Sequence, residues 1–303
     1  MTGQAKKRLE SISFLGQLTR QGGIDLHIHT TASDGSDTPE EIVRLAMING
    51  LRAIAIADHD TIDALPNANT AVQQLKAKYG YDLLLIPATE MAVEFEQNTV
   101  HLLAYFPYGG IEGLEPLLAR QRATRVERNQ KILRQLDKLG FAISEEEVRQ
   151  QKKDDSASLL GRSHIALAMV QKGYVKTMAD AFNKYLKSGR PAFVHRSRDP
   201  LDKITAEIHR QGGVAVLAHP QMYNWTGKGK NNQPSSFLLN KLTGAKKMGL
   251  DGVECFHGEA TTKEQEELLQ ASLVLNLTPT AGSDYHGTNK TEVKLYTGTS
   301  LFY

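Results

Sequence analysis

The sequence predicts an α/β fold in which a barrel of strands and helices carries an inserted helical subdomain. Short apolar, β-branched segments alternate with helical patterns over most of the chain, which is typical of βαβ units with parallel strands. Histidines and carboxylates follow the ends of those segments, where barrel enzymes build their active sites. Between residues 108 and 190 the alternation stops, and one helical pattern follows another.

Composition leaves room for one large domain plus a smaller one. A chain of 303 residues can bury a large core. The formal charge of +2, with 23% charged residues, gives no whole-chain signal for nucleic-acid or membrane binding. The single Cys255 excludes an internal disulfide framework and fits a reducing cytoplasm. We therefore expect a cytoplasmic protein with no membrane contact and no DNA-specific binding.

The N-terminal residues show no targeting pattern. Residues 1–22 contain Lys6, Lys7 and Arg8 but no apolar core or small-residue cleavage site. The longest apolar runs of the chain are far too short to span a bilayer. We expect a loosely held N-terminal extension.

The elements before the insertion alternate regularly. A strand over residues 23–27 leads to a helix for which Thr38 suits the N-cap, Pro39 suits the first turn and Glu41 completes a capping box. The pattern then predicts a strand over 53–57, a helix over 64–78, a strand over 83–86 that leads to Glu90, and a strand over 100–106. After the insertion, strands are expected over 214–217, 252–256 and 279–281.

The first helix of the insertion, over residues 115–139, has polar residues within an apolar face. Arg122, Arg125 and Asn129 fall among leucines on a helical wheel. These arginines can snorkel to water, or they can point into a cleft and hold phosphate, to which the guanidinium fork is suited. The cluster Gly161-Arg162-Ser163-His164 opens another helix, and a helix N-terminus can bind an anion.

The spacing of several histidines suits metal ligands. Side chains at i and i+2 of a strand point to the same side, so His27 and His29 can present both imidazoles to one point. Asp284 and His286 repeat this spacing. A lone His-x-His is often a coincidence, but three later segments of the same kind argue against it. The other candidates beside strand ends are Asp34, His59, Glu90, His101 and His219.

Besides His164, three histidines lie outside this set. His209 lies within a helical pattern and is interpreted as a surface residue. His257 follows a strand and is interpreted as structural, with support of the ligands as the alternative. His195 is either a neighbour of the substrate or a structural residue.

These motifs together resemble the polymerase and histidinol phosphatase (PHP) superfamily. The resemblance covers nearly the whole chain after residue 23. It rests on His27-Ile28-His29 with Ser33-Asp34-Gly35, Ala57-Asp58-His59-Asp60, Glu90, His101, Ala218-His219-Pro220 and Ser283-Asp284-Tyr285-His286. Within it, Gly161 to His164 and Arg190 to Val194 are similar to the branch of nucleoside 3',5'-bisphosphate phosphatases and ribonuclease AM-type 5'-3' exoribonucleases. His195, where proline is expected, and the N-terminal extension depart from that pattern.

The resemblance implies a distorted (β/α)7 PHP barrel with an inserted helical subdomain. Residues 23–107 and 191–303 would form the metal-binding barrel, 108–190 the substrate-binding insertion, and 1–22 an extension. Three divalent metal ions are implied, commonly manganese, with iron or zinc as alternatives. One ion would take His27, His29, Glu90 and Asp284, a second Glu90, His101 and His219, and a third Asp34, His59 and His286. Mixed imidazole and carboxylate ligands suit these metals.

The implied activity is that of a metal-dependent phosphoesterase that uses a metal-activated hydroxide and no protein nucleophile. It would remove the 3'-phosphate of nucleoside 3',5'-bisphosphates or release nucleotides from the 5' end of short RNA. Arg162 and His164, with Arg125 or Arg128, would hold a second phosphate, and Lys187 and Arg190 are weaker candidates. The alternatives are a phosphatase for a metabolite such as histidinol phosphate and a non-catalytic, polymerase-associated module.

Overall fold

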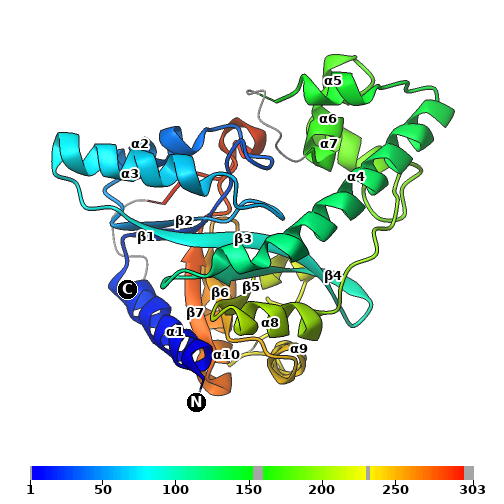
Figure 1. Ribbon diagram of the computed structural model, residues 1–303. Helices are drawn as coiled ribbons and strands as arrows, with labels where there is room; N and C mark the ends of the chain where they lie inside the picture. Colours follow the sequence, from blue (N-terminus) through cyan, green and yellow to red (C-terminus); the bar gives the residue numbers. More distant parts are fainter. Residues whose placement is uncertain (1, 153–159, 230–232, 297–303) are drawn as a thin grey trace.

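Seven strands form one curled sheet in the computed structural model, which describes residues 2–152, 160–229 and 233–296. The first and last strands meet, because Ile28 pairs with Tyr285 and the amide of Asp284 donates to the carbonyl of His27 at 2.8 Å. The prediction of a distorted, nearly closed seven-stranded α/β barrel is therefore confirmed (Figure 1). The strands, in sheet order, are β1 (Ile24–Ile28), β2 (Ala53–Ile56), β3 (Leu84–Phe95), β4 (Asn98–Tyr105), β5 (Val214–Leu217), β6 (Gly252–His257) and β7 (Thr278–Gly282).

One strand departs from the expected parallel arrangement. β4 runs antiparallel to both β3 and β5. β3 does not end near Glu90 but continues to Phe95, and the chain reverses at Glu96 and Gln97, whose φ angles are 48° and 62°. Two residues with positive φ form the tight connection that an antiparallel hairpin needs. The sequence hides this turn because neither residue is the glycine or asparagine usually found there.

Helices cover the outside of the barrel. α2 (Pro39–Ile48) and α3 (Leu65–Tyr79) pack on each other beside β1 to β3 (Figure 1). The capping box of α2 is confirmed, since Thr38 Oγ1 accepts from the Glu41 amide and the Thr38 amide donates to the Glu41 carboxylate. The remaining outer elements are α8 (Leu201–Arg210), α9 (Ser236–Lys247) and α10 (Thr262–Leu275), with the short helices η1 (Ile111–Leu114), η3 (Pro220–Tyr223) and η4 (Gly287–Lys290).

The N-terminal segment is not loosely held, and that expectation is wrong for residues 3–21. They form α1 (Gly3–Gln21), which packs against β7 at the lower end of the barrel (Figure 1). Leu15 is fully buried in the barrel core. Arg8 donates to the carboxylate of Asp251, which also lies 2.8 Å from His209 Nε2. His209 is therefore a partly exposed residue of α8 that is held in place by Asp251.

The insertion is helical, as expected, and its core is separate from that of the barrel. It contains α4 (Glu115–Lys138), α5 (Glu145–Arg149), α6 (Arg162–Gln171), α7 (Met178–Ala181) and the π-helical turn η2 (Phe182–Leu186). α4 belongs to both parts: Leu117 and Leu118 lie in the barrel core, whereas Ile132 and Leu136 lie in the core of the insertion. This one helix therefore ties the insertion to the barrel (Figure 1).

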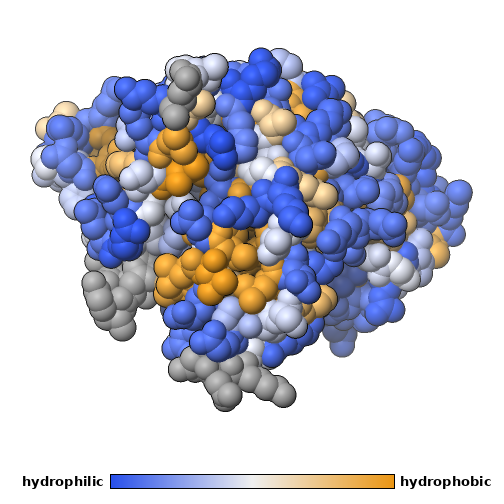
Figure 2. Space-filling model, turned by 90° about the horizontal axis from the view of Figure 1, so that it is seen from below, coloured by the Kyte–Doolittle hydropathy of each residue, from blue (hydrophilic) through white to orange (hydrophobic). Residues whose placement is uncertain are grey.

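Apolar side chains are exposed at the lower face of the barrel. Seen from below, they gather near the middle of that face (Figure 2). Leu9 on α1 and Leu273 on α10 are 49% and 62% exposed, and both line a hollow there. Among the described helices, none combines the length and apolar character needed to cross a bilayer.

The burial of α1 predicts a large effect of one core substitution. Leu15→Ala removes a fully buried side chain, so the free energy of unfolding should fall by about 2–5 kcal/mol in urea titrations. Leu9→Ala on the same helix is the matched control. A substitution at this exposed site should change the free energy of unfolding by less than about 0.5 kcal/mol. Equal effects of the two substitutions would show that α1 does not dock as described.

Candidate metal centre

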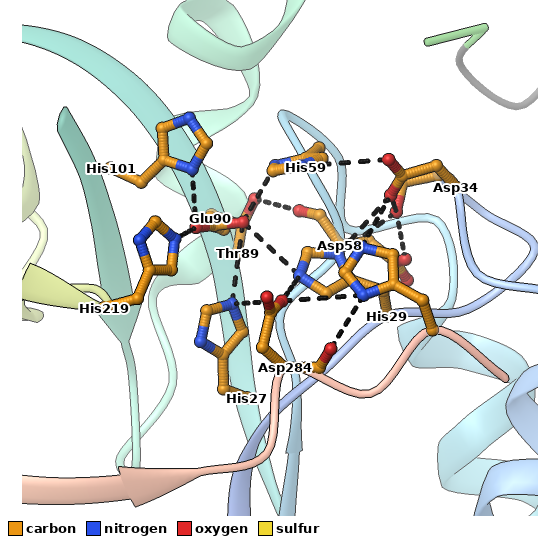
Figure 3. A network of polar contacts seen from close by, with 12 residues as sticks. His27, His29, Asp34, Asp58, His59, Thr89, Glu90, His101, His219 and Asp284 are labelled. Atoms are coloured by element: carbon orange, nitrogen blue, oxygen red, sulfur yellow. Dashed lines mark hydrogen bonds and ion pairs between the residues drawn. The ribbon is translucent and has the colours of Figure 1, made fainter. Parts of the chain in front are cut away.

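The imidazoles of His27 and His29 point to the same place inside the barrel mouth (Figure 3). Both are fully buried, and their ring centres lie 5.1 Å apart. The Nε2 atom of His27 lies 3.6 Å from Glu90 Oε2 and 3.5 Å from Asp284 Oδ1. The corresponding distances for His29 Nε2 are 3.4 Å and 3.3 Å. Two nitrogens from β1 thus face two carboxylate oxygens from β3 and the segment after β7.

Glu90 lies between two groups of histidines. Its Oε1 atom is 2.8 Å from His101 Nδ1 and 2.9 Å from His219 Nε2. Its Oε2 atom faces His27 and His29 and lies 2.9 Å from His59 Nδ1. The antiparallel pairing of β3 and β4 sets Ala92 opposite His101, so His101 and Glu90 share one face of the hairpin. A carboxylate whose two oxygens face separate ligand groups has the geometry of a bridge.

A third group surrounds Asp34. His286 Nε2 lies 3.3 Å from Asp34 Oδ1, and His59 Nε2 lies 4.0 Å from Asp34 Oδ2. The loop that presents Asp34 is fixed by the buried carboxylate of Asp58, which accepts from the amide and hydroxyl of Thr30 and from Ser33 Oγ at 2.5–2.8 Å. All nine residues predicted as ligands therefore lie in one continuous cluster.

The donor set fits divalent metal ions. The buried atoms His27 Nε2, His29 Nε2 and His59 Nδ1 have no hydrogen-bond partner among the described residues. Two ligand atoms that each stand about 2.1 Å from a shared ion are roughly 3.0–3.4 Å apart, depending on the coordination angle. The separations of 3.3–3.6 Å around His27 and His29 are close to that range and too long for good hydrogen bonds. Imidazole and carboxylate groups that can hold metal ions are thus preassembled here.

The electrostatics show that the cluster needs positive charge. Burial disfavours the imidazolium of His29, but the nearby carboxylates of Asp284 and Glu90 outweigh this effect and raise the pKa of His29 to about 10. Burial likewise disfavours the carboxylate forms of Glu90 and Asp284, yet the surrounding histidines hold both pKa values well below the usual range. A positively charged partner is therefore favoured beside Glu90 and Asp284, and metal ions would supply that charge in place of protons on the ligands.

Arginines from both parts of the chain meet next to the histidine cluster. Asp60 directly follows His59 and is fully buried. Its Oδ2 atom accepts from Arg125 Nη2 at 2.6 Å and from Arg196 Nη1 at 3.2 Å. Arg125 therefore points into the protein rather than snorkelling to water, and its bond to Asp60 joins α4 to the barrel.

Arg128 lies on the same helix and has no such partner. Its side chain is 6% exposed, and its Nε atom makes no hydrogen bond to a described residue. Burial, together with the positive charges of Arg125, Arg162, Arg196 and Arg198, lowers the pKa of Arg128 to about 8. Among the described residues, Asp60 is the only carboxylate that pairs with any of these five guanidinium groups, which we call the arginine cluster, so a bound anion would balance part of their charge.

The other predicted substrate-binding residues differ in position. Arg162, at the start of α6, donates to the Leu186 carbonyl and stands over the Phe182 ring. His164 Nδ1 accepts from the Gly161 amide at 3.0 Å, and burial lowers the pKa of His164 to about 4. It therefore caps α6 as a neutral residue and offers a phosphate no charge. Arg190 is exposed, and its side chain bonds to none of the described residues.

Sequence reasoning missed several residues of this region. Arg196 and Arg198 contribute to the arginine cluster, but no spacing rule connects their loop with α4.

His257 is fully buried, with Nε2 3.6 Å from Asp284 Oδ2, so it lies against the predicted metal ligands. His195 is exposed. Glu254, also fully buried, contacts His27 and was detectable only as an acidic residue inside an apolar strand.

A pocket of about 250 Å³ opens over the histidine cluster. Asp34, His59, His101 and His286 form part of its lining. Its remaining walls include Met178 and Phe182 from the insertion and Met222 from the segment after β5. A charged floor below apolar side chains suits a ligand with a phosphate at one end and a flat apolar group at the other.

Comparison with known proteins points in one direction. A family model described as the PHP domain matches residues 25–210. The 5'-3' exoribonuclease Rnm of Escherichia coli is 31% identical, with 86% of this chain and 84% of the relative covered. A 3',5'-nucleoside bisphosphate phosphatase of Chromobacterium violaceum is 28% identical, with 87% of each covered. A phosphoribosyl 1,2-cyclic phosphate 1,2-diphosphodiesterase of Eggerthella lenta is 31% identical, with 87% and 94% covered.

The structural comparison agrees with these relatives. A crystal structure from Bifidobacterium adolescentis, described as a metal-dependent phosphoesterase, superposes with a TM-score of 0.75 at 30% identity. The match covers 90% of each chain.

The raised pKa of His29 predicts how the EDTA-treated protein responds to pH. The pKa is about 10 when folded, against an ordinary value of 6.5. The stabilisation is thus fully present below about pH 6.5 and is lost as the pH rises through 10. The Tm of the EDTA-treated protein should fall over this interval in calorimetry, and His29→Asn should make the decline shallower. A Tm independent of pH in this range would contradict the assignment.

The position of Glu90 predicts a loss of metal. Glu90→Gln keeps the shape of the side chain but removes the charge that faces both groups of histidines, so bound metal and turnover should both collapse. Metal content is measured by plasma mass spectrometry after dialysis against Mn²⁺. His195→Ala is the control and should keep the wild-type content. A Glu90→Gln protein with wild-type metal and turnover would exclude the bridge.

Proposed function

This chain belongs to the PHP domain family and is a metal-dependent phosphoesterase, and we propose that its substrates are nucleotides that carry a 5'-phosphate. The bond to be cleaved is the one between O3' and phosphorus. In a nucleoside 3',5'-bisphosphate its hydrolysis releases inorganic phosphate, and at the 5' end of a short RNA it releases the first nucleotide. Both proposed activities therefore need the same site.

Arg128, which is buried and has no acidic partner among the described residues, carries this proposal. An excess of buried positive charge is costly unless a bound anion neutralises it. The arginine cluster and the histidines are linked at two places. Asp60, which binds Arg125, directly follows His59 in the chain. Ser163, next to Arg162, donates to Asp34 Oδ2 at 3.0 Å. One phosphate can thus be held by arginines while a second ester group lies over the histidines.

We assign three divalent ions to the three ligand groups, with manganese preferred and iron or zinc as alternatives, because the ligands mix imidazole and carboxylate. Such ions neutralise phosphate oxygens and lower the pKa of a bound water towards neutrality. The protein's own residues orient the substrate. Arg128 and Arg162 hold the 5'-phosphate, and Asp60 fixes Arg125 and Arg196 beside it.

No protein nucleophile takes part in the proposed reaction. Cys255 is the only cysteine, is fully buried in β6, and has a pKa raised to about 12 by burial. A thiol in that environment is not ionised at neutral pH and does not reach the pocket. The proposed chemistry is direct attack of water on phosphorus.

The apolar side of the pocket favours a nucleotide over a smaller phosphate ester. Met178, Phe182 and Met222 line the pocket above the histidines, and an aromatic ring with flexible thioethers can contact the face of a base. The relative from Eggerthella lenta suggests a second candidate, a phosphoribosyl cyclic phosphate, which also pairs a 5-phosphate with a second ester but has no base.

A panel of substrates with added Mn²⁺ tests the proposal. Adenosine 3',5'-bisphosphate and a 5'-phosphorylated oligoribonucleotide should be hydrolysed fastest, and AMP should accumulate rather than be consumed. Histidinol phosphate and phosphoribosyl 1,2-cyclic phosphate represent the competing activities. A preference for either would overturn the nucleotide assignment, and no hydrolysis of any substrate would favour a non-catalytic module.

Arg128→Gln should separate substrate binding from stability. A charge-assisted hydrogen bond to phosphate is worth roughly 1.5–3 kcal/mol, so kcat/KM for the bisphosphate should fall about ten- to a hundredfold. Because the substitution relieves repulsion among arginines, Tm should not fall. Arg134→Gln, at an exposed position of the same helix, is the matched control. Equal losses on the bisphosphate and on p-nitrophenyl phosphate would show that Arg128 does not hold the second phosphate.

A further inference from the structure

Glu254 is a buried carboxylate that no part of the proposed reaction uses. It lies on β6, is fully buried, and pairs with no lysine or arginine among the described residues. Its two oxygens instead contact two different strand ends. Oε1 lies 2.9 Å from His27 Nδ1, and Oε2 accepts from the backbone amide of His219 at 2.8 Å. A buried carboxylate is costly to keep, so a contact of this kind needs an explanation.

The contact with His27 decides which ring nitrogen is available. Once the histidine is neutral, a proton on Nδ1 is donated to Glu254, and the lone pair is left on Nε2. Nε2 has no hydrogen-bond partner among the described residues and faces Glu90 and Asp284. Carboxylates placed in this way raise the basicity of a metal-binding imidazole and fix the orientation of its ring.

The contact with His219 fixes a strained backbone. His219 has a φ of 34°, in the left-handed region that side chains other than glycine rarely adopt. In this conformation its Nε2 reaches Glu90 Oε1 at 2.9 Å. The hydrogen bond from its amide to Glu254 helps to hold that conformation. Glu254 therefore supports one histidine on each side of Glu90.

The packing around Glu254 separates its contact with His27 from the pocket. A Cβ atom at Gly282 of β7 would lie 2.2 Å from His27 Cβ and 2.9 Å from Glu254 Oε1. A side chain at position 282 would clash with both residues, so only glycine leaves space for the contact between Glu254 on β6 and His27 on β1. The contact is thus enclosed by the three strands and excluded from the pocket, because Glu254 is not among the pocket-lining residues.

We propose that Glu254 is a positioning residue for the metal centre, which orients His27 and the backbone of His219 without itself binding metal or substrate. The inference rests on the proposed metal centre but not on the identity of the substrate. Loss of such a supporting carboxylate typically weakens metal binding by about ten- to a hundredfold.

Glu254→Gln tests the proposal through metal binding. The Mn²⁺ and Zn²⁺ dissociation constants of the EDTA-treated protein, measured by competition with a fluorescent chelator, should rise about ten- to a hundredfold. Turnover should be recovered when Mn²⁺ is raised by the same factor, because the ligands themselves remain. Glu267→Gln is the matched control: Glu267 is also buried, accepts from the amides of Gly227 and Ser235, and does not line the pocket over the histidines. Its metal affinity should stay at the wild-type value.

Glu254→Asp guards against a folding defect. This variant keeps the charge, so its metal affinity should lie between those of the wild type and Glu254→Gln. Its Tm should be close to the Tm values of both proteins. Equal affinity of Glu254→Gln and the wild type, or a loss that added Mn²⁺ does not reverse, would overturn the proposal. So would a wild-type protein that binds no metal. A substrate other than a nucleotide would overturn only the proposed function.

Discussion

The charge of one buried carboxylate organises the open end of this barrel. Glu90 has imidazoles close to both oxygens, from β1, β4 and the segments after β2 and β5. No single strand can supply such a set, so the strands must end at the same level and point inwards together. The nearly closed sheet meets this requirement, and the reversed β4 brings His101 to the face of Glu90 from the neighbouring strand. The same nearly closed sheet therefore forms the fold and brings the proposed ligands together.

Positive charge is distributed unequally around this centre. His27 and His29, whose pKa values are raised by the neighbouring carboxylates, lie on one side, and the arginines of α4 and of the loop before α8 lie on the other. Asp60 lies between the histidines and the arginines, because it directly follows His59 and accepts hydrogen bonds from Arg125 and Arg196. The two regions are thus electrostatically distinct but mechanically joined, which suits a substrate with two phosphates in different chemical roles.

Local sequence patterns predicted those parts of the structure that depend on neighbours in the chain. The capping box at Thr38 and the shared direction of His27 and His29 follow from periods of a few residues. The patterns failed where distant segments decide. The face of α1 that packs on β7 mixes apolar and small polar residues and gives only a weak apolar pattern, and the turn at Glu96 and Gln97 lacks the usual residues. Arg196 and Glu254 gain their importance from contacts with α4 and β1 that no spacing reveals.

The pairing of the first strand with the segment after the last has a consequence for how the protein is made. His29 and His286 lie in the same cluster, yet more than two hundred residues separate them in the chain. Synthesis of that length takes a ribosome on the order of ten to fifty seconds. The centre cannot be completed before Asp284 and His286 have been synthesised, because the segment that carries them closes the barrel against β1. The proposed metal ligands therefore come together only when the barrel closes.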